Sequence, residues 1–285
     1  YASGTPRRDE VSLLLQGVPR KQPGLGAIVS NPEMIPGYYS KIDAGMTREE
    51  IIKQYEVSGS SLTGGTSIFD PVLCELMYFW FVPENGAILD PFAGGSARGV
   101  VANYLNYRYT GIELSGEQVD ANIQQGIDIT PNNPPEWFCG DSNIILDTID
   151  KKFDFIFSCP PYYDLEVYGD DPRDLSNMSY DDFNSIYESI IKKACILLRD
   201  NRFACFVVGN VRDKNGFIKN LVGVTISAFE KCGLKFYNDL ILRNAVGTSA
   251  LRAKRIMKYK KMTKVHQNVL VFCKGDPKLA GSKTI

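Results

Sequence analysis

The sequence predicts an α/β protein with a doubly wound, mostly parallel sheet. Apolar strand-like runs alternate with helix-like runs between residues 67 and 276, a pattern typical of parallel strands joined by helices. The last two strand-like runs, 235–242 and 267–273, have no regular helix between them, so we expect the final strand to run antiparallel. A chain of 285 residues, 44% hydrophobic and 23% charged, can form one large domain with extensions.

The first predicted helix covers residues 71–81, with Asp70 as its N-cap and Pro71 at its first position. Strand 87–90 follows and ends in a glycine turn. The next predicted elements are, in order, helix 96–105, strand 108–113, helix 115–125, strand 136–139, a short turn or helix near 142–147, strand 153–158, helix 180–198, strand 203–208 and helix 217–231. Ser179 is the expected cap of helix 180–198, whose apolar residues share one face.

The two ends of the chain show less pattern. Residues 1–66 are rich in Gly, Pro and Ser and are expected to form an N-terminal arm, with one short helix over 46–55 capped by Thr47. Residues 277–285 are expected to form a C-terminal tail. The chain begins at Tyr1 rather than Met, which leaves open whether a native start precedes it.

Composition and charge narrow the function classes. The formal net charge is −1, so any polyanion-binding surface must be local. We find no apolar run near the roughly 20 residues that a membrane span needs, and no signal peptide. Seven cysteines without a Cys-x-x-Cys pair indicate reduced thiols. The single histidine, His266, argues against a zinc site and a Ser–His nucleophile. We therefore expect a cytoplasmic protein without a metal.

The first candidate site is the turn that ends strand 87–90, which reads Asp90-Pro91-Phe92-Ala93-Gly94-Gly95-Ser96. Glycines between a buried strand and a helix let a ligand approach the backbone closely. The turn has neither the Gly-Lys-Ser/Thr of a phosphate loop nor the Gly-x-Gly-x-x-Gly spacing of dinucleotide sites. The next strand ends in Glu113, whose carboxylate can accept both hydroxyls of a ribose. Asp141 follows the third strand, so acids stand at three consecutive strand ends.

The second candidate site is Ser158-Cys159-Pro160-Pro161-Tyr162, which follows the fourth strand. Two adjacent prolines fix the backbone and leave carbonyl groups free to accept hydrogen bonds. Such acceptors could bind both hydrogens of an exocyclic amine and draw its nitrogen toward tetrahedral geometry, which exposes the lone pair. Tyr162 adds an aromatic ring that can stack on a flat ligand.

These two turns resemble the cofactor and catalytic loops of the S-adenosylmethionine-dependent amino-methyltransferases that modify cytosine N4 or adenine N6 in DNA. Over residues 67–276 the chain is also similar to phage-type DNA methylases with a Cys-Pro-Pro-Tyr loop. The resemblance implies a Rossmann-like class I methyltransferase fold with a seven-stranded sheet. It also implies cofactor contacts: Asp70 and Asp90 on the methionine side, Gly94 and Gly95 against the cofactor, Glu113 on the ribose, and Phe92 and Asp141 at the adenine.

Cys159 departs from that family, in which Asp, Asn or Ser stands at this position. A thiol is a weak acceptor, so in amine methylation Ser158 or Asp164 would have to supply the acceptor. Alternatively, Cys159 is a nucleophile that attacks C6 of cytosine and activates C5, which requires a thiolate. We favour the amine reaction. Asp164 also lies within loop reach to move a proton.

A basic segment lies between the last two strands, within residues 243–266, and is predicted to bind phosphates. Its basic residues are Arg252, Lys254, Arg255, Lys258, Lys260, Lys261 and Lys264. The predicted partner is DNA. Two alternatives stay open, an RNA base methyltransferase and a DNA-binding protein that holds S-adenosylmethionine without catalysis.

Overall fold

The computed structural model describes residues 45–47, 50, 69–163, 171–213, 215–243, 253 and 256–282. The chain divides into two compact units, residues 1–71 and 72–285. In the first unit, Glu50 N–H donates to Thr47 Oγ1 (3.3 Å) and Thr47 N–H donates to Glu50 Oε2 (2.8 Å). This reciprocal pair is a capping box, as expected for the predicted N-cap at Thr47.

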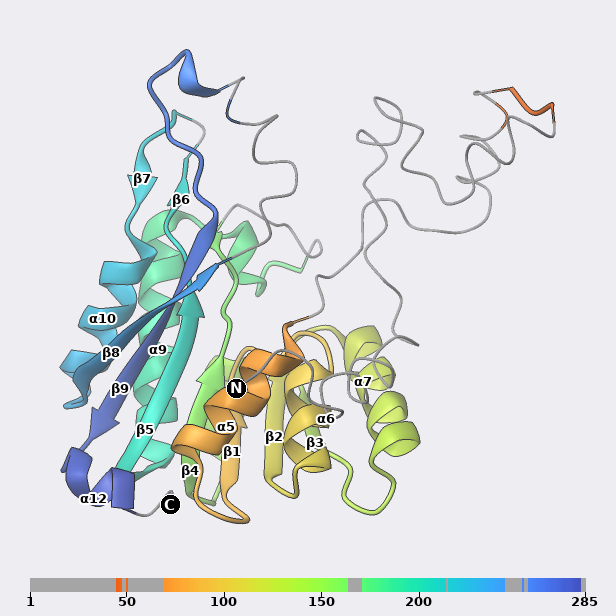
Figure 1. Ribbon diagram of the computed structural model, residues 1–285, viewed down its shortest axis with the longest axis vertical. Helices are drawn as coiled ribbons and strands as arrows, with labels where there is room; N and C mark the ends of the chain where they lie inside the picture. The colour runs from red at the N-terminus through yellow and green to blue at the C-terminus, as the bar shows by residue number, and fades with distance from the viewer. Residues whose placement is uncertain are drawn as a thin grey trace. The chain divides into compact units, whose positions relative to one another are not determined.

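The second unit is built on a seven-stranded sheet with the order β3-β2-β1-β4-β5-β9-β8 (Figure 1). Its strands are β1 (Ala87–Asp90), β2 (Arg108–Glu113), β3 (Glu136–Cys139), β4 (Phe153–Ser158), β5 (Leu198–Val208), β8 (Lys235–Arg243) and β9 (His266–Lys274). Strands β1 to β5 pair in parallel. Strand β9 runs antiparallel to both neighbours, β5 and β8. The mostly parallel sheet with an antiparallel last strand is therefore confirmed.

Helices cover both faces of this sheet (Figure 1). On one face lie α5 (Pro71–Phe81), α6 (Ala97–Tyr104) and α7 (Gly116–Ile129). On the other lie α8 (Ser142–Ile145), α9 (Tyr180–Leu197) and α10 (Leu221–Lys231). Alternate side chains of β4 serve the two faces, as a pleated strand requires. Phe155 stacks on Phe81 of α5 (5.9 Å between ring centroids), whereas Ile156 joins the cluster under α9.

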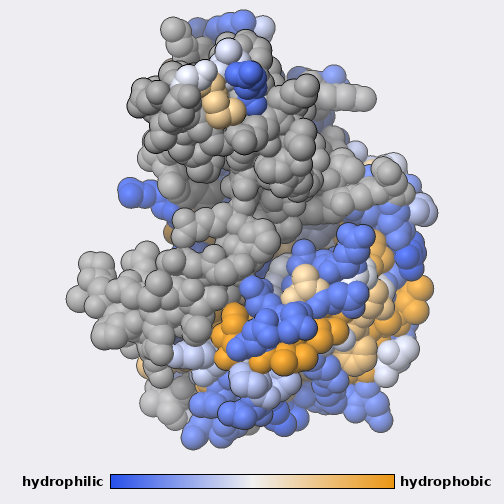
Figure 2. All heavy atoms as spheres, turned by 90° about the vertical axis from the view of Figure 1, so that its right-hand side faces the viewer, coloured by the Kyte–Doolittle hydropathy of each residue, from blue (hydrophilic) through white to orange (hydrophobic). Residues whose placement is uncertain are grey.

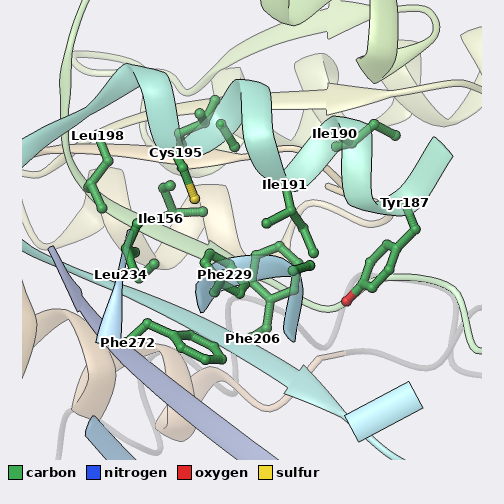
Figure 3. Packing of buried hydrophobic residues seen from close by; sticks show 14 of the residues in the cluster. Ile156, Tyr187, Ile190, Ile191, Cys195, Leu198, Phe206, Phe229, Leu234 and Phe272 are labelled. Carbon is green, nitrogen blue, oxygen red and sulfur yellow. The ribbon is translucent and has the colours of Figure 1, made fainter. Parts of the chain in front are cut away.

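Helix α9 supplies the main core on its face of the sheet. Figure 3 shows Tyr187, Ile191 and Cys195 pointing from α9 toward the strands, and Phe229 of α10 lying beside Phe272 of β9. The last two rings stack with centroids 4.2 Å apart. Fully burying each such side chain contributes about 1.5–3 kcal/mol, so this face anchors the parallel strands.

Several element bounds differ from the prediction. Strand β5 starts at Leu198 rather than residue 203, and the predicted helix 217–231 begins only at Leu221. Two short strands before that helix, β6 (Val211–Arg212) and β7 (Ile218–Lys219), form a hairpin that was not predicted, because two-residue strands carry no periodicity. Helix α12 (Pro277–Ser282) occupies most of the predicted C-terminal tail.

The surface of the second unit includes exposed apolar side chains. The side that carries α7 exposes apolar groups among hydrophilic ones (Figure 2), and Ile123 and Ile127 are exposed on α7.

Among the residues described, no helix has the length and apolar character to cross a membrane. The same part of the chain has no cluster of three His, Cys, Asp or Glu side chains suited to a metal ion.

We expect Asp154→Asn to destabilise the fold. Asp154 of β4 accepts hydrogen bonds from Ala87 N–H (3.0 Å), Arg199 Nη1 (2.7 Å) and Arg202 Nε (3.0 Å). Burial raises the pKa of Asp154, but these hydrogen bonds outweigh burial and lower it. The substitution should cost about 1.5–3 kcal/mol of unfolding free energy in urea at neutral pH.

The same interaction predicts a pH dependence. Because the folded-state pKa is lowered, the stabilisation is fully present above the unfolded-state pKa and is lost as pH falls through the folded-state value. The difference between wild type and Asp154→Asn should therefore shrink under acid conditions. Asp150→Asn, at an exposed position four residues earlier, is the matched control. A constant difference across acid pH would contradict the ion-pair explanation.

Candidate active site

The two predicted loops meet at the carboxyl edge of the sheet. Strand β1 pairs with β2 on one side and with β4 on the other, so the chain reverses its direction of travel across the sheet at β1. Such a switch point opens a crevice beyond the strand ends, where ligands bind in open α/β sheets. The glycine turn after β1 and the Cys159 loop after β4 border this point, and hydrogen bonds join them. Phe92 N–H donates to Ser158 Oγ (3.2 Å).

Asp90 lies beneath both loops in a closed polar cluster. Its carboxylate is fully buried and accepts hydrogen bonds from Arg98 Nε (2.6 Å), Tyr109 Oη (2.6 Å) and Ser158 Oγ (2.5 Å). Phe92 N–H also donates to Asp90 Oδ1 (3.2 Å). The resemblance assigned Asp90 to the methionine end of a cofactor. In the structure these internal partners engage the carboxylate and hold the two loops together, and its contact with a cofactor stays a prediction.

Arg98 of α6 is the counter-charge in this cluster, and it was not among the predicted site residues. Its Nη2 donates to the carbonyl oxygens of Phe92 and Ala93, both at 2.8 Å, so the side chain fixes the start of the glycine turn. Burial by itself lowers the pKa of Arg98, but the adjacent Asp90 charge outweighs burial and raises it. The one available signal was a charged residue within an otherwise apolar helix start.

The glycine turn itself is open. Gly94 has φ +54°, which favours glycine. Its carbonyl accepts a hydrogen bond from Asn122 Nδ2 (2.8 Å). Apart from the glycine itself and its two chain neighbours, no described residue has a heavy atom within 4 Å of the point where a Cβ on Gly94 or Gly95 would stand. The backbone is therefore uncovered, as a closely bound ligand requires.

Glu113, at the end of β2, holds this turn from the side. Its Oε2 accepts Gly94 N–H and its Oε1 accepts Ser115 N–H, both at 2.9 Å. Burial raises the pKa of Glu113, and these backbone hydrogen bonds offset only part of that effect. A carboxylate offers about four lone-pair sites, so the group keeps capacity to accept hydroxyl donors from a ligand.

The remaining predicted cofactor residues lie in varied settings. Asp141 is half-buried and caps α8 by accepting Asn143 N–H (2.8 Å). The adjacent Ser142 Oγ donates to Pro91 O (2.5 Å), which brings the third strand end to the glycine turn. Phe92 packs on Tyr187, with ring centroids 5.8 Å apart, at the core under α9. Asp70 is exposed directly before α5.

The Cys159 loop has one buried and one accessible part. Ser158 and Pro160 are buried, whereas Cys159, Pro161 and Tyr162 are half-buried. Because Ser158 donates to Asp90 and accepts from Phe92, its position does not offer it to a substrate amine. Cys159 Sγ lies 3.6 Å from Tyr162 Oη, which also donates to Val207 O (3.4 Å). Asp164 lies outside the described residues.

Tyr163 adopts φ +54°, a conformation that costs free energy for a residue other than glycine. Its ring packs edge-on against Tyr180 (5.2 Å) and Phe183 (5.6 Å), so α9 holds the strained end of the loop.

Part of the predicted basic segment borders the same loop. A Cβ placed on Gly209 would stand 3.4 Å from Lys264 Nζ and 3.7 Å from Tyr162 Cε1. Burial lowers the pKa of Lys264. Lys258 and Lys260 are exposed, and Lys261 is half-buried. Arg252, Lys254 and Arg255 lie outside the described residues.

Comparisons with known proteins identify the fold. No family model and no curated protein sequence matches the chain. The [4+2]-cyclase SpnF matches with a TM-score of 0.50 and 15% identity, over 72% of this chain and 82% of that chain. TrmN from Thermus thermophilus matches with a TM-score of 0.48 and 12% identity, over 73% of this chain and 50% of that chain. Magnesium protoporphyrin IX methyltransferase (ChlM) from Synechocystis PCC 6803, solved with bound SAM, matches with a TM-score of 0.46 and 9% identity, over 72% of this chain and 79% of that chain.

At these identities the likeness concerns the fold, and the chain spans half the length of TrmN. The chain has the Rossmann-like α/β fold that its sequence predicted, with a seven-stranded, mostly parallel sheet, and it shares this fold with SpnF.

We expect Arg98→Met to be among the most destabilising substitutions in this unit. It would leave the fully buried Asp90 without its counter-charge, and removing one partner of a buried pair costs about 3–5 kcal/mol. Arg98→Lys, which keeps the charge but loses the forked donors to Phe92 and Ala93, should lie between. Urea unfolding measures the effect, with Arg108→Met at the exposed start of β2 as the control. Equal stability of wild type and Arg98→Met would show that the pair does not support the fold.

Proposed function

We propose that this protein transfers a methyl group from S-adenosylmethionine to the exocyclic amino group of cytosine (N4) or adenine (N6) in DNA. One observation carries the proposal. An uncovered glycine turn and a Pro-Pro-Tyr loop lie side by side at the switch point of a methyltransferase-type sheet, joined by the hydrogen bond between Phe92 and Ser158.

The residues present fit the proposed cofactor. The backbone at Gly94 and Gly95 is open to a ligand, and Glu113 beside it keeps acceptor capacity for two ribose hydroxyls. An adenine ring also needs an apolar side chain against its face. Leu114, directly after β2, is half-buried and could contact the ring, whereas Ile112 is 1% exposed and could not. When bound, S-adenosylmethionine would supply an electrophilic methyl group on a sulfonium.

The chain's own residues would then position the amine. Pro160 and Pro161 provide no N–H donors, so the loop presents acceptors to the two amine hydrogens. Tyr162 Oη donates to Val207 O and its ring is half-buried beside the core, so the side chain would present a fixed ring on which an extruded base could stack. Asp90 and Ser158 brace the loop from beneath, because both are buried and joined at 2.5 Å.

A second reaction is favoured by one specific observation, the half-buried thiol of Cys159 at the first position of the loop. As a thiolate it could attack C6 of cytosine and direct methylation to C5. The two reactions make opposite demands on this residue, so one set of variants separates them.

The third prediction concerns Glu113. Glu113→Ala should weaken S-adenosylmethionine binding in calorimetry by ~1.5–3 kcal/mol, because charged hydrogen bonds are lost. Glu113→Gln keeps the shape and one acceptor, so it should lie between. Burial raises the pKa of Glu113, so as pH decreases its carboxylate should become protonated at a higher pH than an ordinary carboxylate. The affinity of the wild type for S-adenosylmethionine should decrease over that range, and the affinity of Glu113→Gln should not. Glu117→Ala, exposed in the first turn of α7, is the control. Unchanged affinity in Glu113→Ala would remove Glu113 from the cofactor site.

The fourth prediction tests the reaction. We expect mass spectrometry of nucleosides from treated duplex DNA to detect N4-methylcytosine or N6-methyladenine. Cys159→Ser should retain or raise this activity, since Ser also stands at this position in related loops. DNA carrying 5-fluorocytosine should give no covalent complex. Tyr162→Ala, which removes the stacking ring, should lower activity and serves as the loss-of-function reference.

Other outcomes would replace the proposal. Formation of 5-methylcytosine, with a denaturation-resistant complex that disappears in Cys159→Ser, would establish the cytosine-C5 reaction. Methylation confined to RNA would change the substrate. Cofactor and DNA binding without any methylated nucleoside would indicate a non-catalytic protein.

A further inference from the structure

The β6–β7 hairpin is a small built element at the same edge of the sheet as the candidate site. It follows the carboxyl end of β5 after only two residues, Gly209 and Asn210. Its tip is held by Asp213, whose N–H donates to Phe217 O (2.9 Å) and whose Oδ1 accepts Phe217 N–H (2.9 Å). Arg212 Nη1 adds a bond to Gly216 O (2.7 Å). Hydrogen bonds among the described residues therefore join the two arms of the hairpin near its tip.

The hairpin is connected to the Cys159 loop at two places, indirectly through Tyr180 of α9 and more directly through Gly209 at its base. Lys219 Nζ lies 4.3 Å above the Tyr180 ring, and that ring packs on Tyr163 of the loop. At the base of the hairpin, Gly209 borders both Tyr162 and Lys264. A ligand that binds the hairpin would therefore also affect the position of the loop that is proposed to receive the base.

The hairpin also touches the basic segment. The Lys261 side chain reaches the position that a Cβ on Gly216 would occupy, so Lys261 of the basic segment lies against the hairpin tip. Figure 1 draws both elements beyond the carboxyl end of β5. We call residues 209–213, 215–219 and 256–264 the hairpin surface.

Apolar side chains stand out of this surface. Phe217 is 73% exposed and Ile218 is 55% exposed, near the tip of the hairpin. Met257, Tyr259 and Met262 of the basic segment are also more than half exposed. Holding a phenylalanine in water forgoes the free energy of burying it, and grouped exposed apolar residues mark binding surfaces.

The charge of the surface identifies the partner. Its basic residues are Arg212, Lys219, Lys258, Lys260, Lys261 and Lys264, and its one acid among the described residues is Asp213. Asp213 is itself engaged at the tip and lies 3.9 Å from Lys219 Nζ. Cations interleaved with exposed aromatic rings suit a polyanion that carries flat bases, because the cations bind phosphates and the rings stack. An apolar protein partner would not require this excess of positive charge.

We infer that the β6–β7 hairpin contacts bases of DNA, with Phe217 stacking on a base next to the one that enters the Tyr162 loop, while Lys258, Lys260 and Lys261 bind the flanking phosphates. Apolar side chains inserted at base steps are a known means of unstacking a duplex. The inference rests on the proposed function, since it requires a nucleic-acid substrate at the loop.

The test compares Phe217→Ala, Phe217→Trp and Phe79→Ala in binding to a 20-base-pair duplex and a 20-nucleotide single strand over a range of salt concentrations. Phe79 is 59% exposed near the end of α5 that leads to the amino end of β1, so it matches Phe217 in type and exposure. Phe217→Ala should weaken binding about 5- to 150-fold, which corresponds to the ~1–3 kcal/mol of one stacked base. Phe217→Trp should restore binding, and Phe79→Ala should equal wild type.

Salt dependence separates stacking from charge. Phe217→Ala should leave the slope of log affinity against log salt unchanged. A Lys258→Ala, Lys260→Ala and Lys261→Ala variant should flatten the slope by up to about 0.9 for each lysine that neutralises a phosphate. Photo-crosslinking with 5-iododeoxyuridine oligonucleotides should label the peptide that contains Phe217. Binding of S-adenosylmethionine should be the same in all these variants.

The possible failures can be told apart. Wild-type affinity in Phe217→Ala, while the DNA is still methylated, would overturn the hairpin inference and leave the proposed function intact. A protein that neither binds nor methylates DNA would overturn both. Phe217-dependent binding of RNA alone would overturn DNA as the partner of the hairpin.

Discussion

The ion pair between Asp90 and Arg98 is the constraint on which the candidate site depends. It joins four parts of the fold: the end of β1, the start of α6, Tyr109 of β2 and Ser158 at the end of β4. Burying the pair costs free energy because both charges lose their hydration. Arg98 also donates hydrogen bonds to the backbone at the start of the glycine turn. These hydrogen bonds fix the backbone of the turn, so its other side can stay open to a ligand.

The order of the strands brings the two candidate functional loops to the same edge of the sheet. Strands β2 and β3 lie on one side of β1, and β4 and β5 lie on the other, so the loops after β1 and β4 border the same crevice. Glu113 ties the end of β2 to the glycine turn, and Ser142 ties the segment after β3 to Pro91. Each strand end thus contributes one polar contact to a common rim, which is the arrangement that a nucleoside-containing ligand needs.

The hairpin surface lies next to that rim. Gly209, Lys219 and Tyr180 connect it to the Tyr162–Tyr163 end of the loop, where the backbone of Tyr163 is strained. Strain of this kind persists where the surroundings hold it and often accompanies function. The exposed rings and lysines lie within the same connected group, so binding and base positioning would be coupled through direct packing.

The sequence by itself determined the fold class, the seven principal strands and the two loops, because burial periodicity and glycine or proline turns are local patterns. It also placed Asp90, Glu113 and Asp141 at one edge, since parallel strands end together. Only the tertiary structure decided which of these groups stay accessible. Asp90 and Glu113 have the same pattern in sequence, yet Arg98 and Tyr109 close over Asp90 while Glu113 remains half-buried. Likewise, the contacts of Lys219 with Tyr180 and of Lys261 with Gly216 place the β6–β7 hairpin next to the candidate site. Accessibility depends on segments that are distant along the chain, and no local pattern encodes it.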